Sequence, residues 1–240
     1  MDKANAMTDI FRRPICTGKA DCHECVIRDL VLFADLEDHD LRHLHQPIEQ
    51  FSYKRGSPIF HIGDTGGAIY TIRGGSVKLV QYLPDGTHRI VGILRQGSVA
   101  GLEALLGKPY ENTTICLENT SACRIAIEDI ERLMQESKHL YRQLHERWYQ
   151  AVREAGQWIT RLSTGDARAR MARLFLYLST GPGKDECRLF SREDVGAVLG
   201  LTPETASHIV ASFKREGIID QQARNLYRCD RGALDAIAGN

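Results

Sequence analysis

The chain has 240 residues, and its 31 lysines and arginines equal its 31 aspartates and glutamates, so the formal net charge is zero. This balance argues against a protein that coats nucleic acid or anionic membranes through bulk positive charge. The first 15 residues hold no apolar signal segment and no run approaches the roughly 18 apolar residues of a membrane span, which predicts a cytoplasmic protein without membrane contact.

Short apolar or alternating segments, separated by Gly, Pro and Asp, run from about residue 48 to 127. The LPDG sequence at 83–86 separates two alternating segments, which is a hairpin signal. Several short strands at this spacing are typical of an antiparallel sandwich or roll, so this part is predicted to be all β. The expected strands are 48–53, 57–62, 68–73, 76–82, 88–94, 113–118 and 121–127.

A long helix is predicted from Lys138 to Leu162, because this span lacks Pro and contains a single Gly. Apolar residues recur there at alternating intervals of three and four, the a/d pattern of a coiled coil. We expect this seam to be a homodimer interface, with Val152 and Ile159 in a second stripe that packs against the β-domain. The alternative is a lone amphipathic helix lying on that domain. The seam comprises Tyr141, Leu144, Trp148, Ala151, Ala155, Trp158 and Leu162.

Two short helices separated by a Gly-containing turn are predicted near the carboxyl end. Ser191, with Asp194 three residues later, caps the first helix, and Thr202 followed by Pro203 caps the second. Such a pair forms a helix-turn-helix. A helix at 167–179 and a loop at 180–187 precede it, and a hairpin at 218–230 follows as a wing. The residues expected to face inward are Val195, Val198, Leu199, Ala206, Ile209, Val210 and Phe213.

The second helix of a helix-turn-helix enters the major groove of double-stranded DNA with its first turns against the base edges. A carboxylate there can accept a hydrogen bond from cytosine, hydroxyls can serve bases or phosphates, and cations at the periphery hold phosphates. The alternative is an ordinary solvated face in a domain that binds no nucleic acid. The expected DNA-binding residues are Glu204, Thr205, Ser207, His208, Arg192, Lys214 and Arg215.

Glu204 and Glu216 balance the charges of Lys214 and Arg215 within this segment. A monomer is therefore expected to bind DNA weakly, and the two half-sites of a palindromic operator are needed for useful affinity.

The segment LGLTPETASHIVASFKREGII at 199–219 resembles the recognition motif of the CRP/FNR transcription regulators, whose pattern is close to LGLTxETxSR. Residues 63–107, from GDTGGAIYTIRGG to EALLG, resemble that family's cyclic-nucleotide-binding-type roll. The resemblance covers roughly residues 20 to 230 and implies an α+β chain with a β-roll, a long dimerisation helix and a winged helix-turn-helix. The implied domains are a cysteine-bearing segment at 1–27, a sensor roll at 28–137, a dimerisation helix at 138–163 and a DNA-binding domain at 164–240.

The recognition motif departs from the FNR type at one position. FNR-type members read DNA with Glu, Ser and Arg, and the matching residues here are Glu204, Ser207 and His208. His cannot make the bidentate contact with guanine that Arg makes. We therefore expect a DNA half-site related to the FNR type, with a relaxed or altered preference at the base pair that the Arg would read. The 83–86 loop lies where family members touch RNA polymerase, which favours an activator.

Cyclic AMP is not expected to be the ligand. In family members that bind cyclic nucleotides, a Glu holds the ribose and an Arg holds the phosphate, and these positions fall on Leu102 and on or near Asn112. A shift in alignment would let Glu103 replace the first contact, but no Arg lies between Arg95 and Arg124. A phosphate without a cationic partner is poorly held.

The chain has seven cysteines, an odd number, and shows no secretory signal. A framework of disulfides is therefore not expected. The CHECVIRD sequence resembles the amino-terminal cysteine group of FNR-type sensors, which ligate a 4Fe–4S cluster. The resemblance implies Cys22, Cys25 and Cys123 as ligands, and Cys16 as the substitute for a downstream cysteine that this chain lacks. His23 and Cys116 are weaker candidates. Oxygen, nitric oxide or redox state would then be the signal.

Several alternatives stay open. The CxxC pair also suits zinc or a thiol switch, or it binds no metal, and Cys123 also suits a small core position. Cys187 and Cys229 are expected to be structural. A cupin-like metal enzyme is not favoured, because His61 and His88 are isolated and no HxH motif occurs. The chain is therefore predicted not to be an enzyme. A ligand-binding protein without DNA function is the remaining class.

Overall fold

The computed structural model describes residues 14–19, 48–136, 138–179 and 185–239. The chain divides into two compact units, one made of Met1–Gln81 with Gly92–Val152 and the other of Tyr82–Val91 with Arg153–Asn240. Among the described residues, none of the helices combines the length and the apolarity needed to cross a bilayer.

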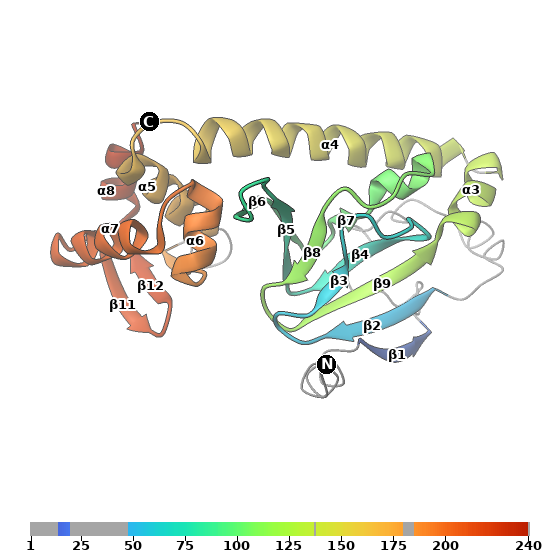
Figure 1. Ribbon diagram of the computed structural model, residues 1–240, viewed down its shortest axis with the longest axis horizontal. Coiled ribbons are helices and arrows are strands. Elements are labelled where there is room, and N and C mark those ends of the chain that lie inside the picture. Colours follow the sequence, from blue (N-terminus) through green and yellow to red (C-terminus); the bar gives the residue numbers. More distant parts are fainter. Residues whose placement is uncertain (1–13, 20–47, 137, 180–184, 240) are drawn as a thin grey trace. The chain divides into compact units, whose positions relative to one another are not determined.

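The roll consists of two antiparallel sheets (Figure 1). The first has the order β1-β2-β9-β4-β7, with β1 at Ile15–Lys19, β2 at Glu49–Tyr53, β4 at Ala68–Gly74, β7 at Val99–Ala100 and β9 at Thr120–Ala126. The second has the order β3-β8-β5-β6, with β3 at Pro58–Phe60, β5 at Ser76–Tyr82, β6 at His88–Arg95 and β8 at Thr113–Cys116. All seven strands expected from the sequence are present, and β1 and β7 are additional.

The hairpin predicted at 83–86 joins β5 to β6. The Leu83 amide donates to the Thr87 carbonyl at 2.8 Å, and the Gly86 amide donates to the Leu83 carbonyl at 3.0 Å. Gly86 has φ +81°, a left-handed conformation that glycine adopts without strain. The Asp85 carboxylate accepts the amide and hydroxyl hydrogens of Thr87, which lowers the pKa of Asp85. The turn residues thus explain where the chain reverses.

Apolar side chains form two clusters in this unit. The smaller one includes Ile72 and Val77, which are fully buried. The larger one gathers residues of β4 and β9, of the helix α3 (Ile127–Glu136) and of the first turns of α4 (Lys138–Leu162). Its α-helical members are Ile127, Ile130, Leu133, Leu140 and Leu144. The roll core therefore continues onto the start of the long helix.

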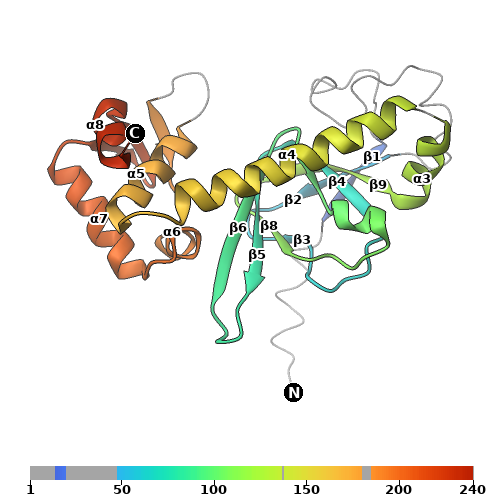
Figure 2. The ribbon, with the colours of Figure 1, turned by 90° about the horizontal axis from the view of Figure 1, so that it is seen from above.

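Helix α4 has the bounds predicted from the sequence and runs unbroken (Figure 2). The faces of α4 differ from the expectation. Leu144 and Leu162 are buried within the chain, at 4% and 1% exposure, whereas Val152 and Ile159 are 72% and 61% exposed. The prediction that Val152 packs against the roll is therefore wrong. A pattern with a period of 3.5 drifts by about 20° per heptad on a straight helix, so it does not stay on one face.

The part of the second unit that follows α4 is the winged helix-turn-helix that the sequence predicts. Its helices are α5 (Ala167–Leu178), α6 (Arg192–Leu199), α7 (Pro203–Arg215) and α8 (Arg231–Ala238), and its sheet has the order β10-β12-β11. The strands are β10 (Glu186–Arg188), β11 (Ile219–Ala223) and β12 (Leu226–Cys229). Part of the predicted loop at 180–187 is strand β10, because β12 offers it a pairing edge that no local pattern reveals.

The caps of α6 and α7 are formed by the predicted residues. The Ser191 hydroxyl accepts the Asp194 amide hydrogen at 3.1 Å, and the Thr202 hydroxyl accepts the Thr205 amide hydrogen at 3.2 Å. Gly200 ends α6 with φ +65°. At Gly196, an added Cβ would lie 2.5 Å from the Leu201 carbonyl oxygen, so the tight turn requires glycine there. These contacts set the angle between the two helices.

The core of this unit is aromatic. Phe175 packs on Phe213 with ring centroids 6.2 Å apart, and it meets Tyr227 edge to face at 5.7 Å. All three side chains are almost completely buried. Helix α5, the inner face of α7 and strand β12 are thereby joined, which orients the outer face of α7. The predicted inward residues are buried, except that Ile209 is half-buried.

Candidate nucleic-acid interface and sensor domain

The outer face of α7 is polar. Glu204, Ser207 and His208 are exposed, while Ala206 and Val210 on the opposite side are buried. Three of the residues predicted to read DNA therefore share one accessible helix face. Thr205 is half-buried, and its hydroxyl is hydrogen-bonded to the Thr202 hydroxyl at 3.1 Å. It lies at the rim of the face rather than at its centre.

Glu204 stands in the first turn of α7. Its carboxylate accepts hydrogen bonds from its own amide and from the Thr202 hydroxyl, and these lower the pKa of Glu204. A negative charge at this end of a helix is also favoured by the helix dipole. The side chain is thus an ionised acceptor at neutral pH, the form that accepts a hydrogen bond from a cytosine amino group.

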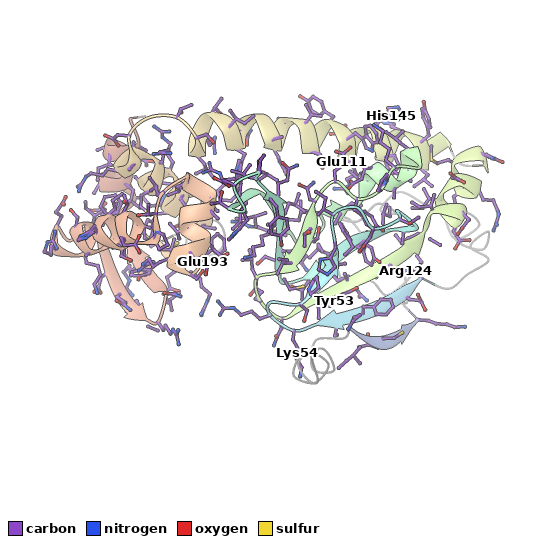
Figure 3. The ribbon with its side chains drawn as sticks, in the orientation of Figure 1. Tyr53, Lys54, Glu111, Arg124, His145 and Glu193 are labelled. Atoms are coloured by element: carbon purple, nitrogen blue, oxygen red, sulfur yellow. The ribbon has the colours of Figure 1, made fainter. Side chains whose placement is uncertain are left out.

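The predicted phosphate-binding cations occupy two different settings. Lys214 and Arg215 are exposed in the last turn of α7, where Lys214 Nζ donates to Gln221 Oε1 of β11 at 2.8 Å. Arg192 is half-buried at the start of α6, and its Nη2 donates to the Tyr227 hydroxyl at 2.9 Å. Arg192 therefore ties the helix-turn-helix to strand β12. The neighbouring Glu193 projects from α6 (Figure 3).

Glu216 interacts chiefly with Arg168, a partner that the sequence did not suggest, and more weakly with the charge of Arg215. Its carboxylate is held by both terminal nitrogens of Arg168 on α5, one of them at 2.9 Å, and by the Ser212 hydroxyl. These contacts lower the pKa of Glu216 to about 2. Sequence reasoning missed Arg168, because the two residues are 48 positions apart and share no local pattern.

The wing carries two exposed arginines that sequence reasoning also left out. Arg224 stands in the turn between β11 and β12, and Arg228 lies on β12. Asn225 adopts φ +59°, the left-handed conformation that asparagine tolerates in tight hairpins. Arg224 and Asn225 are the two residues of the turn between the paired Ala223 and Leu226. An Asn at this point, between two alternating segments, is the sequence signal that would have placed Arg224 at the tip of the wing.

In cyclic-nucleotide-binding members of the family, a Glu and an Arg hold the ribose and the phosphate. The matching region here, residues 102–112, has Leu102 and Asn112 at or near these two positions. Leu102, in the 3₁₀ helix η2 (Leu102–Leu106), packs against the roll core. Glu103 Oε1 accepts the Glu111 amide hydrogen at 3.0 Å, so its carboxylate fastens the loop itself. Tyr110 stacks on Phe60 with ring centroids 3.8 Å apart, and its hydroxyl donates to the Ala68 carbonyl at 2.6 Å.

One cation near this region, Arg124, is engaged within the roll. Arg124 on β9 forms an ion pair with Glu49 of β2 at 3.3 Å, and Figure 3 shows Arg124 and Tyr53 on these neighbouring strands. Asn112, at or near the position of the phosphate-binding Arg, is neutral, and its buried Oδ1 accepts no hydrogen bond within the described residues. The region at 102–112 therefore offers no support for binding cyclic AMP.

The candidate metal ligands are only partly described. Cys22 and Cys25, like His23, lie outside the described residues. Cys16 is exposed on β1 and pairs with Phe51, whereas Cys123 of β9 is 9% exposed and pairs with Gln50. Because neighbouring side chains on a strand point to opposite faces, Cys16 and Cys123 lie on opposite faces of one sheet.

The described residues contain no group of three or more His, Cys, Asp or Glu side chains arranged to hold a metal ion. Cys116 is buried within the roll, which raises the pKa of its thiol to about 11. That thiol is a poor source of the thiolate that metals require.

Comparison with known proteins relates both units to described domains. Residues 50–137 match the model of the cyclic nucleotide-binding domain, and residues 169–237 match the model of the Crp-like helix-turn-helix domain. The chain belongs to the CRP/FNR family of transcription regulators. The family and the order of its parts agree with the prediction from the sequence.

Full-length relatives of this CRP/FNR chain are regulators. It is 28% identical over 228 residues to the transcriptional activator protein anr of Pseudomonas aeruginosa, a match that covers 92% of this chain and 93% of the relative. It is also 28% identical over 239 residues to the fumarate and nitrate reduction regulatory protein of Salmonella typhi, with 96% of each chain covered. These relatives are DNA-binding transcription regulators rather than enzymes, as predicted.

Solved structures confirm the fold of the CRP/FNR chain. FixK2 from Bradyrhizobium japonicum superposes with a TM-score of 0.72 at 23% identity, covering 80% of this chain and 98% of that one. The CRP-family regulator TTHB099 from Thermus thermophilus gives a TM-score of 0.70 at 23% identity, covering 79% and 96%.

Proposed function

We propose that this CRP/FNR regulator binds a palindromic DNA operator as a homodimer, with α7 of each copy in the major groove. The exposed polar face of α7, backed by a buried apolar face and fixed by two caps, carries the proposal. Glu204, Ser207 and His208 would contact base edges, and Thr205 would serve the phosphate backbone.

The cations around this face would hold the backbone of the DNA. Lys214 and Arg215 are exposed and are assigned to phosphates, with Arg224 of the wing as an additional contact. Arg192 is assigned a supporting part, because its guanidinium is bonded to Tyr227 and keeps the wing against α6.

A second copy of the chain would cover the exposed apolar face of α4. Trp148, Val152 and Ile159 are 38%, 72% and 61% exposed, and they recur at intervals of four and seven along one side of the helix. His145 and Ala155 continue this stripe. Pairing of two such helices would set the two copies of α7 roughly 34 Å apart, the spacing of half-sites one DNA turn apart.

We further propose that oxygen, nitric oxide or redox state controls the regulator through its amino-terminal cysteines. The relatives named for activation and for regulating fumarate and nitrate reduction support such a signal. A four-thiolate cluster that joins Cys16 to Cys123 does not fit the described strands, because these residues lie on opposite faces of one sheet. The proposal is therefore limited to Cys22, Cys25 and Cys123, and the alternative is a regulator without a metal cofactor.

The DNA-binding part is tested by fluorescence anisotropy with a labelled duplex selected from random palindromic sequences. We expect specific binding by the purified chain and a large loss for the double variant Glu204→Ala, Ser207→Ala. Selection that enriches no sequence, or unchanged binding by the double variant, would contradict the proposal.

The redox part is tested by iron and sulfide analysis of the anaerobically purified chain. We expect Cys16→Ser to keep the iron and sulfide of the parent chain and Cys123→Ser to lose them. A chain free of iron and sulfide that still binds its operator would establish the alternative without a cofactor.

A further inference from the structure

Two cysteines of the DNA-binding unit, expected from the sequence to be merely structural, lie together. Cys187 is on β10 and Cys229 is on β12, and they are 0% and 5% exposed. Cys187 pairs directly with Tyr227, two residues before Cys229. Residues two apart on a strand share a face, so the two thiols are diagonal neighbours on the buried face of the small sheet.

The surroundings of Cys229 favour its thiolate. Its sulfur is hydrogen-bonded with the Cys187 side chain, the Ser179 hydroxyl lies 3.8 Å away and shares its single proton between this sulfur and the Phe175 carbonyl, and the positive charge of Arg231 lies nearby. Together these lower the pKa of Cys229, against the opposing effects of burial and of the Asp185 carboxylate. Cys116 provides a contrast, because burial there outweighs its hydrogen bond with Thr120 and raises the pKa of its thiol.

The partners of Cys229 are themselves held in place. Arg231 Nη1 donates to the Ser179 carbonyl at 3.2 Å, and the Ser179 hydroxyl also donates to the Phe175 carbonyl at 2.7 Å. The Cys229 amide donates to the Asp185 carbonyl at 2.6 Å, which fixes the end of β12 against β10. The pair of thiols therefore sits in a defined polar environment inside an apolar core.

We propose that Cys187 and Cys229 form a redox-active dithiol, which a peroxide converts to a disulfide inside the DNA-binding unit. This modification site is separate from the amino-terminal cysteines.

The oxidation balances with hydrogen peroxide as the oxidant. The Cys229 thiolate attacks one peroxide oxygen, so an S–O bond forms, the O–O bond breaks and hydroxide leaves. The Cys187 sulfur then attacks the sulfenic sulfur of Cys229, so the S–S bond forms and the S–O bond breaks. The departing hydroxides take up the two thiol protons. Two thiols and one peroxide thus give one disulfide and two waters.

The disulfide would act on the helix-turn-helix through Tyr227. Diagonal partners in an antiparallel sheet are about 7–8 Å apart, whereas disulfides usually join Cα atoms about 4.4–6.8 Å apart, so the bond draws β10 and β12 together. Tyr227 lies opposite Cys187 and holds Arg192 at the start of α6. The effect on DNA binding rests on the proposed function, whereas formation of the disulfide does not.

The first test uses the wild-type chain. The reduced protein is treated with hydrogen peroxide, unfolded, alkylated and mapped by mass spectrometry. We expect a cross-linked Cys187–Cys229 peptide about 2 Da lighter than the two thiol peptides, which dithiothreitol reverses. Cys116, whose thiol has a raised pKa, serves as the internal control and should be recovered as an alkylated thiol. Recovery of Cys187 and Cys229 as separate peptides would overturn the proposal.

A second test asks whether Arg231 acts on the Cys229 thiol. Arg231→Gln should move the pH dependence of cross-linking to higher pH, because the thiolate loses a neighbouring cation. Arg142→Gln, an exposed arginine of α4, is the matched control and should leave the profile unchanged. A profile that is the same in all three proteins would remove Arg231 from the proposal.

A third test measures operator affinity before and after peroxide treatment. We expect a several-fold greater loss in the wild-type chain than in Cys187→Ala, Cys229→Ala, which keeps the amino-terminal cysteines and their own response to peroxide. An equal loss in the double variant would overturn the regulatory role of the pair. Failure of the reduced wild-type chain to bind DNA would instead contradict the proposed function and leave the peptide map to decide on the disulfide.

Discussion

Arg168 on α5 and Glu216 after the last turn of α7 form an ion pair through both terminal nitrogens of the guanidinium. The guanidinium carbon, Cζ, also lies over the Phe213 ring, 4.9 Å from its centroid. A carboxylate at the carboxyl end of a helix is opposed by the helix dipole, and Arg168 offsets this repulsion. The pair therefore fixes the end of the recognition helix to the core of its unit. It also makes Arg168, rather than Lys214 or Arg215, the main counter-charge of Glu216.

Glu216→Gln should reduce the acid sensitivity of folding. The pKa of Glu216 lies near 2 instead of the ordinary 4.5, so the pair stabilises the folded state above about pH 4.5 and loses this contribution as the pH falls towards 2. The effect is small, because both side chains are exposed enough for solvent to screen them. Thermal unfolding between pH 2 and 7 measures it, with Glu186→Gln, an exposed carboxylate of β10, as the control.

Thr202→Ala should weaken both folding and DNA binding. The Thr202 hydroxyl accepts the Thr205 amide hydrogen, and loss of such a cap costs about 0.5–2 kcal/mol. Thr202→Ser keeps the hydroxyl and should behave like the parent chain. Urea unfolding and operator anisotropy on the three proteins provide the comparison, and equal stability of the Ala and Ser variants would remove the cap from the account.

His208→Arg should change the preferred operator. A guanidinium makes a bidentate contact with guanine that imidazole cannot make, and such contacts contribute about 1–3 kcal/mol of discrimination. We expect the variant to select one base pair of each half-site more strictly than the parent chain. Binding-site selection by sequencing measures this, and identical sequence preferences for both proteins would contradict it.

Val152→Glu should separate the dimer. The Val152 side chain is 72% exposed in one chain, so a charge there is harmless to the monomer but is buried when a second α4 covers it. Gln157→Glu places the same charge on another exposed side of α4 and is the matched control. The association constant of the dimer, measured by sedimentation equilibrium, and the affinity for the operator should both fall for Val152→Glu and stay unchanged for Gln157→Glu.

Leu144→Ala should instead lower the stability of the roll. Leu144 is 4% exposed and packs with the residues of α3 and the sheet, and truncation of such a leucine costs about 2–5 kcal/mol. Trp148→Ala, on the exposed side, should weaken association with little effect on unfolding of the monomer. Urea unfolding combined with sedimentation distinguishes the two positions.

Local patterns in the sequence were enough to predict seven strands of the roll, the bounds of α4 and the two capped helices, but not β1 and β7. Each of these predictions depends on residues close together in the chain, such as the alternation along β5, the turn at 83–86 or the hydroxyl of Thr202 three residues before the amide it caps. The family resemblance likewise rested on the continuous segments at 63–107 and 199–219.

Contacts between distant residues were decided only by the tertiary structure. The periodicity of α4 could not tell that Leu144 faces the roll while Val152 is exposed, because a helix offers several similar stripes and packing selects among them. Arg168 meets Glu216 and Cys187 meets Cys229 only because folding brings α5 to α7 and β10 to β12. The sequence by itself determined the elements and the kind of protein, and the tertiary structure decided which charges and thiols act on one another.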